Sequence, residues 1–517
     1  HIPTQKNEFI ANLGKEIQER GKISSIVHYH NSYFVGFLMD GILLLEKQKE
    51  TNHYQIQSLP INSGVFCLKK DRFQDVVWIG TDGQGVYLYS NPLYSIKSMV
   101  LSNYTEKIER PVRAIYLDDE RTFWVGTKGN GILKIYDYEF DKNISDCRAE
   151  VLTTSNSALS SNAVYCFAKS HRNLLWIGDE EGLTYYSYRE KRIKSIPIRI
   201  GNEDFKYIHD IYETADSELW LASVGMGVVK ARIAGTPDNP VIVDAQRYII
   251  NDGELGSNYF FTIYAENEAN LLFGNKGYGV FRYNETTNGL EPVSTHKYEN
   301  MTLNNILAIS KDSSNNYLFG TSYGLIKYTS ETSYQLFNAK NGFLNNTIHA
   351  ILRNSSDDFW LSTNLGLINF DTKRNVFRSY GFGDGLKVVE FSDGAAFRDS
   401  QTGTLFFGGI NGVVAIRADG RPEQLYMPPV YFDKLSIFGE QYNLGEFLTR
   451  KKETEVLNLQ YDQNFFSVSF ASVDYLNGNN CTYFYKLKGL SDQWVNNGSE
   501  SGVSFTNMAP GEYTLLV

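Results

Sequence analysis

The chain has 517 residues, of which 42% are hydrophobic and 14% aromatic, and its formal net charge is −10. This acidic balance argues against a nucleic-acid surface, which needs a basic stripe to meet the phosphates. No run of about 18 apolar residues occurs, so the sequence predicts no membrane-spanning helix within this chain. Its 4 cysteines have no CxxC spacing, which argues against both a zinc site and a disulfide scaffold.

A short motif recurs along almost the whole chain. It reads Trp-Ile-Gly-Thr-Asp-Gly-Gln-Gly-Val at residues 78–86, and related sequences return at residues 124–132 and 176–183. The third positions of successive copies lie 42 to 52 residues apart. A period of this size, made of short apolar runs, predicts a β-propeller or a solenoid. Weaker copies begin at Phe34, Trp220, Leu272, Leu318, Trp360 and Phe406.

Each repeat predicts one four-stranded blade. In the repeat that starts at Pro111, we expect strands at residues 112–117, 122–127 and 132–136, and a more variable segment supplies the fourth. Tight polar and Gly-rich turns join these strands, as in an antiparallel meander. One such sheet leaves two apolar faces uncovered, so it has to stack on neighbours, and radial closure removes the open ends. A small residue at the third position of the first strand, such as Ala114, would relieve crowding near the axis.

Counting the repeats divides the chain into three parts. Nine copies exceed the about four to eight blades of common propellers, so we expect a seven-bladed ring over residues 107–425, with a single nine-bladed ring as the alternative. Residues 1–106 then supply the last blades of an earlier propeller whose opening blades precede residue 1. Residues 426–517 begin with a Pro-stiffened joint at Met427 and alternate like an immunoglobulin-type β-sandwich with an incomplete last strand. The predicted fold class is all-β.

Several stretches of the chain resemble a known family. Residues 159–164 (Leu-Ser-Ser-Asn-Ala-Val) lead into residues 175–178 (Leu-Trp-Ile-Gly), and two Tyr-containing stretches follow at residues 483–490 and 507–513. These stretches resemble the regulator-type propeller repeats and the three-Tyr (Y_Y_Y) sandwich domain in the periplasmic sensor regions of Bacteroidetes hybrid two-component systems. Asp179 departs from the Thr that is usual after the Trp-Ile-Gly sequence.

The resemblance implies a sensor and not an enzyme. It implies propellers and a sandwich on the periplasmic side of the inner membrane, then a transmembrane helix and a cytoplasmic histidine kinase and response regulator. The implied ligand is an oligosaccharide released from glycans, and the implied response is control of polysaccharide-utilisation genes. We also expect a homodimer through the C-terminal sandwich, no cofactor, and no nucleic acid bound by this region.

The binding surface is expected on one face of the propeller. The turn between the second and third strands and the start of the first strand lie on the same face, so polar groups from every blade converge around the channel. Asn, Lys and Arg can bond sugar hydroxyls or anionic groups, and Tyr offers a flat face to a sugar ring. For each residue the alternative is an ordinary turn former. The candidates are Arg113, Lys128, Asn130, Tyr165, Glu180, His209, Tyr259, Lys276, Tyr278, Tyr323, His349, Asn364 and Asn411.

No catalytic or metal-binding set is predicted. The paired carboxylates at residues 118–119, 180–181 and 357–358 lie in predicted turns, where Asp commonly satisfies the backbone. His28 and His30 share one face of a strand but have no third ligand nearby. Two other functions stay open, namely a propeller-type glycan hydrolase or lyase and a protein-interaction propeller without a small ligand.

Overall fold

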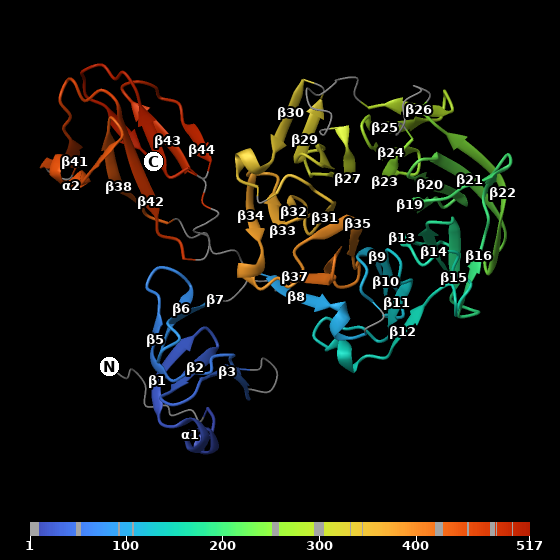
Figure 1. Cartoon of the computed structure of the whole chain (residues 1–517), viewed down its shortest axis with the longest axis horizontal. Helices are drawn as coiled ribbons and strands as arrows, with labels where there is room; N and C mark the ends of the chain where they lie inside the picture. Colours follow the sequence, from blue (N-terminus) through green and yellow to red (C-terminus); the bar gives the residue numbers. More distant parts are fainter. Residues whose placement is uncertain are drawn as a thin grey trace. The chain divides into compact units, whose positions relative to one another are not determined.

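The computed structural model confirms the all-β fold class (Figure 1). By the contacts within it, the chain divides into two compact units. The first unit comprises residues 1–93, 421–478 and 502–510, and the second comprises residues 94–420, 479–501 and 511–517. The residues that the structure describes are 10–47, 53–90, 94–105, 108–250, 258–293, 304–330, 332–343, 345–418, 428–451, 454–475, 481, 483–498 and 500–517.

Residues 94–418 of the second unit fold into four-stranded antiparallel sheets, which are the blades expected from the repeats. Seven such sheets lie within the described residues, besides a short hairpin of β17 (Arg199–Ile200) and β18 (Glu203–Asp204). The strands of the sheets are β9 (Val112–Leu117), β10 (Phe123–Thr127), β11 (Ile132–Ile135), β12 (Ala149–Leu152); β13 (Val164–Lys169), β14 (Leu174–Asp179), β15 (Leu183–Ser187), β16 (Arg192–Ser195); β19 (Ile208–Glu213), β20 (Glu218–Ser223), β21 (Gly227–Thr236), β22 (Asn239–Tyr248); β23 (Phe260–Asn267), β24 (Asn270–Asn275), β25 (Gly279–Asn284), β26 (Gly289–Pro292); β27 (Ile306–Lys311), β28 (Tyr317–Thr321), β29 (Leu325–Ser330), β30 (Ser333–Phe337); β31 (Ala350–Arg353), β32 (Asp358–Thr363), β33 (Gly366–Asp371), β34 (Val376–Tyr380); and β35 (Phe391–Arg398), β36 (Leu405–Gly409), β37 (Gly412–Ala418) with β8 (Tyr94–Val100).

These sheets are arranged around a common centre (Figure 1). The first strand of each sheet packs against the first strand of the next, from β9 through β13, β19, β23, β27 and β31 to β35, and β35 packs against β9. The last sheet is completed by β8, which pairs antiparallel with β37 from Val100 opposite Gly412 to Tyr94 opposite Ala418. Hydrogen bonds within one sheet therefore join the two ends of the ring, with β8 as the outer strand of that sheet.

The predicted domain boundaries fall between residues 106 and 107 and between residues 425 and 426, which lie outside the described residues, as does Met427 of the joint. Strand β8 precedes the first of these boundaries and still belongs to the same sheet as β35, β36 and β37. The boundaries stay a prediction, and this pairing draws residues 94–100 into the propeller that follows them.

Close packing between blades explains the small residues of the repeat. Gly126 of β10 lies opposite Ala114 of β9, and a Cβ atom on Gly126 would come within 2.8 Å of Val164 Cγ1 on the next blade. At Gly178 of β14, a Cβ atom would approach the Sγ atom of Cys166 to 2.5 Å. The crowding that the sequence suggested therefore arises where each blade meets the first strand of its neighbour.

The tryptophan of the repeat is buried between blades, and its indole nitrogen is bonded by a turn carboxylate. Trp124 is fully buried, and its indole N–H donates to Asp118 Oδ2 at 2.9 Å. The other oxygen of Asp118 accepts from the backbone N–H of Thr122 at 2.7 Å. Because a buried indole N–H needs an acceptor, Asp118 both forms the turn and fixes the ring, as its placement in a turn indicated.

The first unit begins with two further sheets of the same repeat and one helix that the sequence analysis did not predict, α1 (Gly14–Arg20). On β7, Val86 and Tyr87 are exposed by 68% and 38%, so this sheet presents apolar side chains to solvent. The strands are β1 (Ile23–Tyr29), β2 (Ser32–Phe37), β3 (Ile42–Lys47) and β4 (Tyr54–Ser58) in one sheet, and β5 (Val65–Lys70), β6 (Val76–Thr81) and β7 (Val86–Ser90) in the other.

The C-terminal strands form two sheets, as expected of the sandwich domain. In the first unit the strand order is β39-β38-β42-β45, next to a β40–β41 hairpin and the short helix α2 (Leu444–Phe447). In the second unit the order is β44-β43-β46. Their bounds are β38 (Val430–Ile437), β39 (Glu440–Tyr442), β40 (Leu448–Lys451), β41 (Thr454–Leu457), β42 (Phe466–Ser472), β43 (Tyr483–Lys488), β44 (Val495–Gly498), β45 (Gly502–Phe505) and β46 (Thr514–Leu516).

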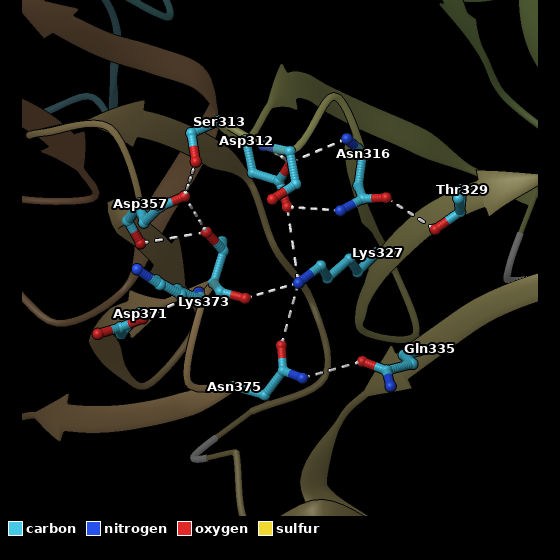
Figure 2. A network of polar contacts seen from close by, with 12 residues as sticks. Asp312, Ser313, Asn316, Lys327, Thr329, Gln335, Asp357, Asp371, Lys373 and Asn375 are labelled. Carbon is cyan, nitrogen blue, oxygen red and sulfur yellow. Dashed lines mark hydrogen bonds and ion pairs between the residues drawn. The ribbon is translucent and has the colours of Figure 1, made fainter.

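A lysine bridges two adjacent blades of the propeller (Figure 2). Lys327 of β29 donates from Nζ to the carbonyl of Thr372 at 2.6 Å and to Oδ1 of Asn375 at 3.2 Å, both in the turn between β33 and β34 of the next blade. The same ammonium lies 3.6 Å from Oδ2 of Asp312, whose side chain is only 2% exposed. A cation held by partners on two sheets ties the sheets together and neutralises a buried carboxylate.

This bridge predicts that Lys327→Met lowers the free energy of unfolding by about 3 kcal/mol, because Asp312 would remain buried without its cation. Urea-induced unfolding followed by tryptophan fluorescence measures the loss. Lys373→Met is the matched control, since Lys373 is exposed on the turn between β33 and β34. Equal stability of the two variants would contradict the assigned role of Lys327.

Candidate functional site

A bulge interrupts the first strand of several blades at the same place. In β13, Val164 and Cys166 pair with the second strand and the residue between them does not. In β19, the same holds between Ile208 and Asp210. Similar skips occur in β9, β23 and β27. A bulge re-aims the side chain of the residue that is left unpaired. The unpaired residues are Arg113, Tyr165, His209, Phe261 and Leu307.

Side chains from successive blades meet along one arc of the propeller centre. The Tyr165 and His209 rings are stacked, with centroids 4.4 Å apart and planes 19° apart. His209 meets Phe261 edge to face at 5.6 Å, and the Arg113 guanidinium lies 5.9 Å from the Tyr165 ring. We call the belt formed by these side chains and their equivalents in the other blades the channel ring; it consists of Arg113, Tyr165, His209, Phe261, Leu307, His349 and Asp393.

The remaining arc of the channel ring is polar. His349 lies directly before β31, with Nδ1 at 2.5 Å from Asp393 Oδ1 and Nε2 at 2.7 Å from Asn364 Oδ1. Arg113 NH1 is 3.6 Å from Asp393 Oδ2 and joins the last blade to the first. The side chains of Arg113, His349 and Asp393 remain 15%, 11% and 27% exposed. The ring therefore offers an aromatic arc and a charged arc side by side.

The electrostatics of the ring follow from burial and from the Arg113 charge. Burial, together with the positive charges of Arg113 and Lys128, lowers the pKa of His209 to about 3, so this imidazole is neutral at physiological pH. Burial would raise the pKa of Asp393, but the hydrogen bond and charge of His349 and the charge of Arg113 lower it overall. Asp393 is therefore an anion that is already engaged by two neighbours.

The structure brings together five of the predicted site residues, namely Arg113, Tyr165, His209, His349 and Asn364. Lys128 and Glu180 lie near enough to act electrostatically on His209 and Tyr165, respectively. That any of these residues contacts a ligand stays a prediction.

Other predicted residues are engaged elsewhere. Asn130 accepts the backbone N–H groups of Glu109 and Arg110 at 3.1 and 2.7 Å, which is the turn-forming role that was the alternative. Asn411 donates to the Lys387 carbonyl at 3.4 Å. Lys276 lies over the Tyr259 ring at 5.8 Å, and Tyr278 and Tyr323 pack against the cores of neighbouring blades.

Sequence reasoning missed three members of the channel ring. Phe261 and Leu307 occupy the same position in the repeat as Arg113, so aligning that position across all copies would have found them. Asp393 lies where the pairing of β35 with β36 is irregular between Phe391 and Ala396. This irregularity hides the equivalence of Asp393 to Arg113 in the repeat.

Asp179 stands where the repeat usually has Thr, and its carboxylate forms hydrogen bonds with the turn that follows. In the first blade, the hydroxyl of Thr127 accepts the backbone N–H of Asn130 and donates to the carbonyl of Gly131. Asp179 Oδ1 accepts the backbone N–H groups of Glu181 and Gly182 at 2.9 and 3.0 Å, and Oδ2 accepts from the Ser160 hydroxyl at 2.5 Å. Burial raises the pKa of Asp179 to about 6 despite these bonds.

Within the part of the chain that the structure describes, no group of three or more His, Cys, Asp or Glu side chains is placed to hold a metal ion. No helix among these residues is long and apolar enough to cross a membrane.

Comparison with known proteins finds a similar architecture in extracellular domains of two-component systems. A Y_Y_Y domain model matches residues 474–517. A protein described as histidine kinase P4, from Formosa agariphila, is 24% identical over 426 residues, covering 78% of this chain and 30% of that protein. The extracellular domain of a hybrid two-component system from B. thetaiotaomicron is 25% identical, with a TM-score of 0.59, and the match covers 95% of this chain and 64% of that chain.

A second extracellular domain of a hybrid two-component system from the same bacterium supports the fold, with 18% identity and a TM-score of 0.50 over 95% of this chain and 66% of that one. The resemblance to the sensor regions of hybrid two-component systems is thus confirmed. The solved relatives are extracellular domains, in agreement with the periplasmic placement that was expected. This chain spans just under two thirds of their length and 30% of the histidine kinase.

The raised pKa of Asp179 predicts a pH-dependent stability. The folded-state pKa of Asp179 is about 6, against an ordinary value of 3.8. The contribution of its protonated carboxyl to the free energy of unfolding is therefore fully present below about pH 3.8 and is lost as the pH rises through about 6. Asp179→Asn keeps an acceptor oxygen and carries no charge. Between about pH 4 and pH 7, the free energy of unfolding of this variant should rise by on the order of 2 kcal/mol relative to that of the native chain.

Urea unfolding at a series of pH values tests this expectation. Asp357→Asn is the control, because the hydrogen bond from Ser313 lowers the pKa of Asp357 and should give a difference of opposite sign. Parallel pH profiles for the native chain and Asp179→Asn would show that Asp179 is charged in the folded state throughout this range.

Proposed function

We propose that this chain, which shares its architecture with the extracellular regions of hybrid two-component systems, binds a glycan-derived oligosaccharide at the mouth of its propeller channel. Binding would signal through the C-terminal sandwich to a cytoplasmic histidine kinase and response regulator that control polysaccharide-utilisation genes. The observation that carries the proposal is the channel ring, in which side chains from successive blades form an aromatic arc next to a charged arc.

The chemistry of the ring suits a sugar. A pyranose presents apolar C–H groups on its faces and hydroxyl groups around its edge, so it needs a flat apolar surface next to hydrogen-bonding groups. Tyr165 and Phe261 supply aromatic surface, and both are partly exposed. Arg113, His349 and Asn364 supply polar atoms within the same belt.

The polar arc supports binding over catalysis. A general base needs a nitrogen or oxygen within reach of the substrate proton. Both ring nitrogens of His349 already have protein partners, Asp393 and Asn364. To act as a general base, His349 would first have to release one of these partners.

We further propose that residues 1–106 contain the last blades of an earlier propeller. The sheets of β1–β4 and β5–β7 repeat the blade pattern, and the exposed Val86 and Tyr87 would be covered by a neighbouring blade. The match covers 64% of the solved extracellular domain, so that domain has further residues in which such blades could lie.

A thermal-shift screen of the ectodomain against defined oligosaccharides tests the ligand. At a concentration 100 times the dissociation constant, a ligand should add about 2.7 kcal/mol of stability. Phe261→Leu should weaken the binding of the inducing sugar about fivefold, because the substitution removes the flat aromatic face and keeps most of the apolar volume. Tyr334→Leu, at an exposed position on β30, is the matched aromatic-to-leucine control.

A saturable shift with one glycan class that Phe261→Leu weakens and Tyr334→Leu leaves unchanged would establish the binding site. No shift across the panel, together with recovery of a stable protein partner by pulldown, would favour an interaction propeller. Product formation from the same glycan pool would instead favour an enzyme.

We also propose a homodimer through the C-terminal sandwich domain. Phe484 on β43 and Trp494 beside β44 are exposed by 47% and 53%, and Leu490 between these strands by 64%. Large exposed apolar side chains that lie close in sequence mark association surfaces. Sedimentation equilibrium should show a dimer that Trp494→Ser weakens and that Phe382→Ser, at a propeller residue exposed by 72%, leaves intact. A monomer at high concentration, with and without ligand, would exclude this mechanism.

A further inference from the structure

The outer side of the propeller carries a hollow that the channel ring does not use. It has a volume of about 680 Å³ and lies between the fourth strands of the first two blades. One wall comes from Glu150 and Leu152 of β12, and the other from residues 192–195 of β16. The loop at residues 156–158 also lines it, and this loop is braced because Asn156 bonds the backbone of Val151 and Thr153.

The floor of the hollow contains a buried cation. Lys134 of β11 is 3% exposed, and its Nζ lies 4.6 Å from the ring of Trp124 and 4.7 Å from that of Tyr186. The ammonium donates to Tyr136 Oη at 2.9 Å and to Glu150 Oε1 at 3.0 Å. Burial lowers the pKa of Lys134, but these two hydrogen bonds outweigh it and the pKa is raised overall. Lys134 therefore keeps its positive charge beneath the hollow.

The rim of the hollow adds more positive charge than its carboxylates neutralise. Lys191, Arg192 and Lys194 line the rim, and with Lys134 they make four cations against Glu150 in the lining. Glu190 pairs with both Arg192 and Lys194. Counting Glu190, four cations face two carboxylates, so two positive charges remain in a chain whose net charge is −10. Such a local excess attracts anions.

Lys191 is the cation best placed to meet an anion. It is exposed at the tip of the turn between β15 and β16. Among the described residues, no carboxylate lies within ion-pair distance of its ammonium, whereas Lys134, Arg192 and Lys194 each have such a partner. An incoming anion would not have to displace an existing partner from Lys191.

We propose that this hollow binds a small anionic ligand through a carboxylate or sulfate group, and that Lys191 contacts the anion. The shared chemistry is an oxyanion, which a free ion or an acidic sugar could supply. The site is separate from the channel ring, because it is built on the outer strands of two blades and the ring is built on the first strands. It does not rest on the proposed sensing of a glycan at the channel mouth.

Isothermal titration of the native chain with glucuronate, inorganic sulfate and glucose tests the site. We expect saturable binding of an anionic probe, and binding that weakens as salt is added, because an exposed charge is screened. Lys191→Glu should weaken this binding about five- to tenfold, since reversing one exposed charge changes the interaction by about 1 kcal/mol. Lys373→Glu is the control, with the same change of charge on the corresponding turn between β33 and β34.

The pattern across probes decides the source of the anion. Binding of both sulfate and glucuronate would support a general oxyanion site, and binding of glucuronate alone would support an acidic sugar. Equal weakening by Lys191→Glu and Lys373→Glu, weakening of glucose binding by Lys191→Glu as large as that of anion binding, or no saturable binding of either anion would overturn the proposal. Phe261→Leu should leave this titration unchanged, which separates it from the test of the channel ring.

Discussion

The pairing of β8 with β37 is the interaction on which the propeller depends, because it joins the start of the ring to its end. Each blade has two apolar faces, and the faces at the seam are covered only when the first and last blades meet. Phe123 and Phe406 pack across this seam with ring centroids 4.9 Å apart, and Arg121 bonds Asp399 at 2.9 Å. The contact of Arg113 with Asp393 crosses the same seam, so the charged arc of the channel ring exists only in the closed ring.

Two positions of the repeat serve opposite purposes within one strand. The small residue and the glycine opposite it, as at Ala114 and Gly126, face the neighbouring blade and leave no room for larger side chains. The bulged position beside the small residue points away from this packing, so its side chain is free to differ from blade to blade. A scaffold of uniform blades can therefore carry a ring with an aromatic half and a charged half.

Lysines on the third strands link the packing of blades to the surface chemistry. Lys134, Lys230 and Lys327 lie on the third strands of different blades, and each has a carboxylate partner. Lys134 and Lys230 also lie over the tryptophan rings of their own blades, at 4.6 and 5.4 Å. A cation in such a place needs these partners because leaving water is costly. In the first blade this structural lysine also lies beneath the outer hollow and contributes to its positive charge.

The amino-acid sequence by itself determined the blades, the Tyr-rich C-terminal domain and four members of the channel ring. These follow from local spacing, since the period of the repeat and the alternation of apolar residues set which residues pair and which face is buried. Arg113, Tyr165, His209 and His349 could be selected because each lies at the entry to a first strand. Only the tertiary structure decided that β8 completes the last sheet, that a bulge re-aims the ring residues, and that Asp393 joins Arg113 and His349 in the charged arc. These features depend on contacts between residues far apart in the chain and on irregular pairing, for which the sequence carries no local signal.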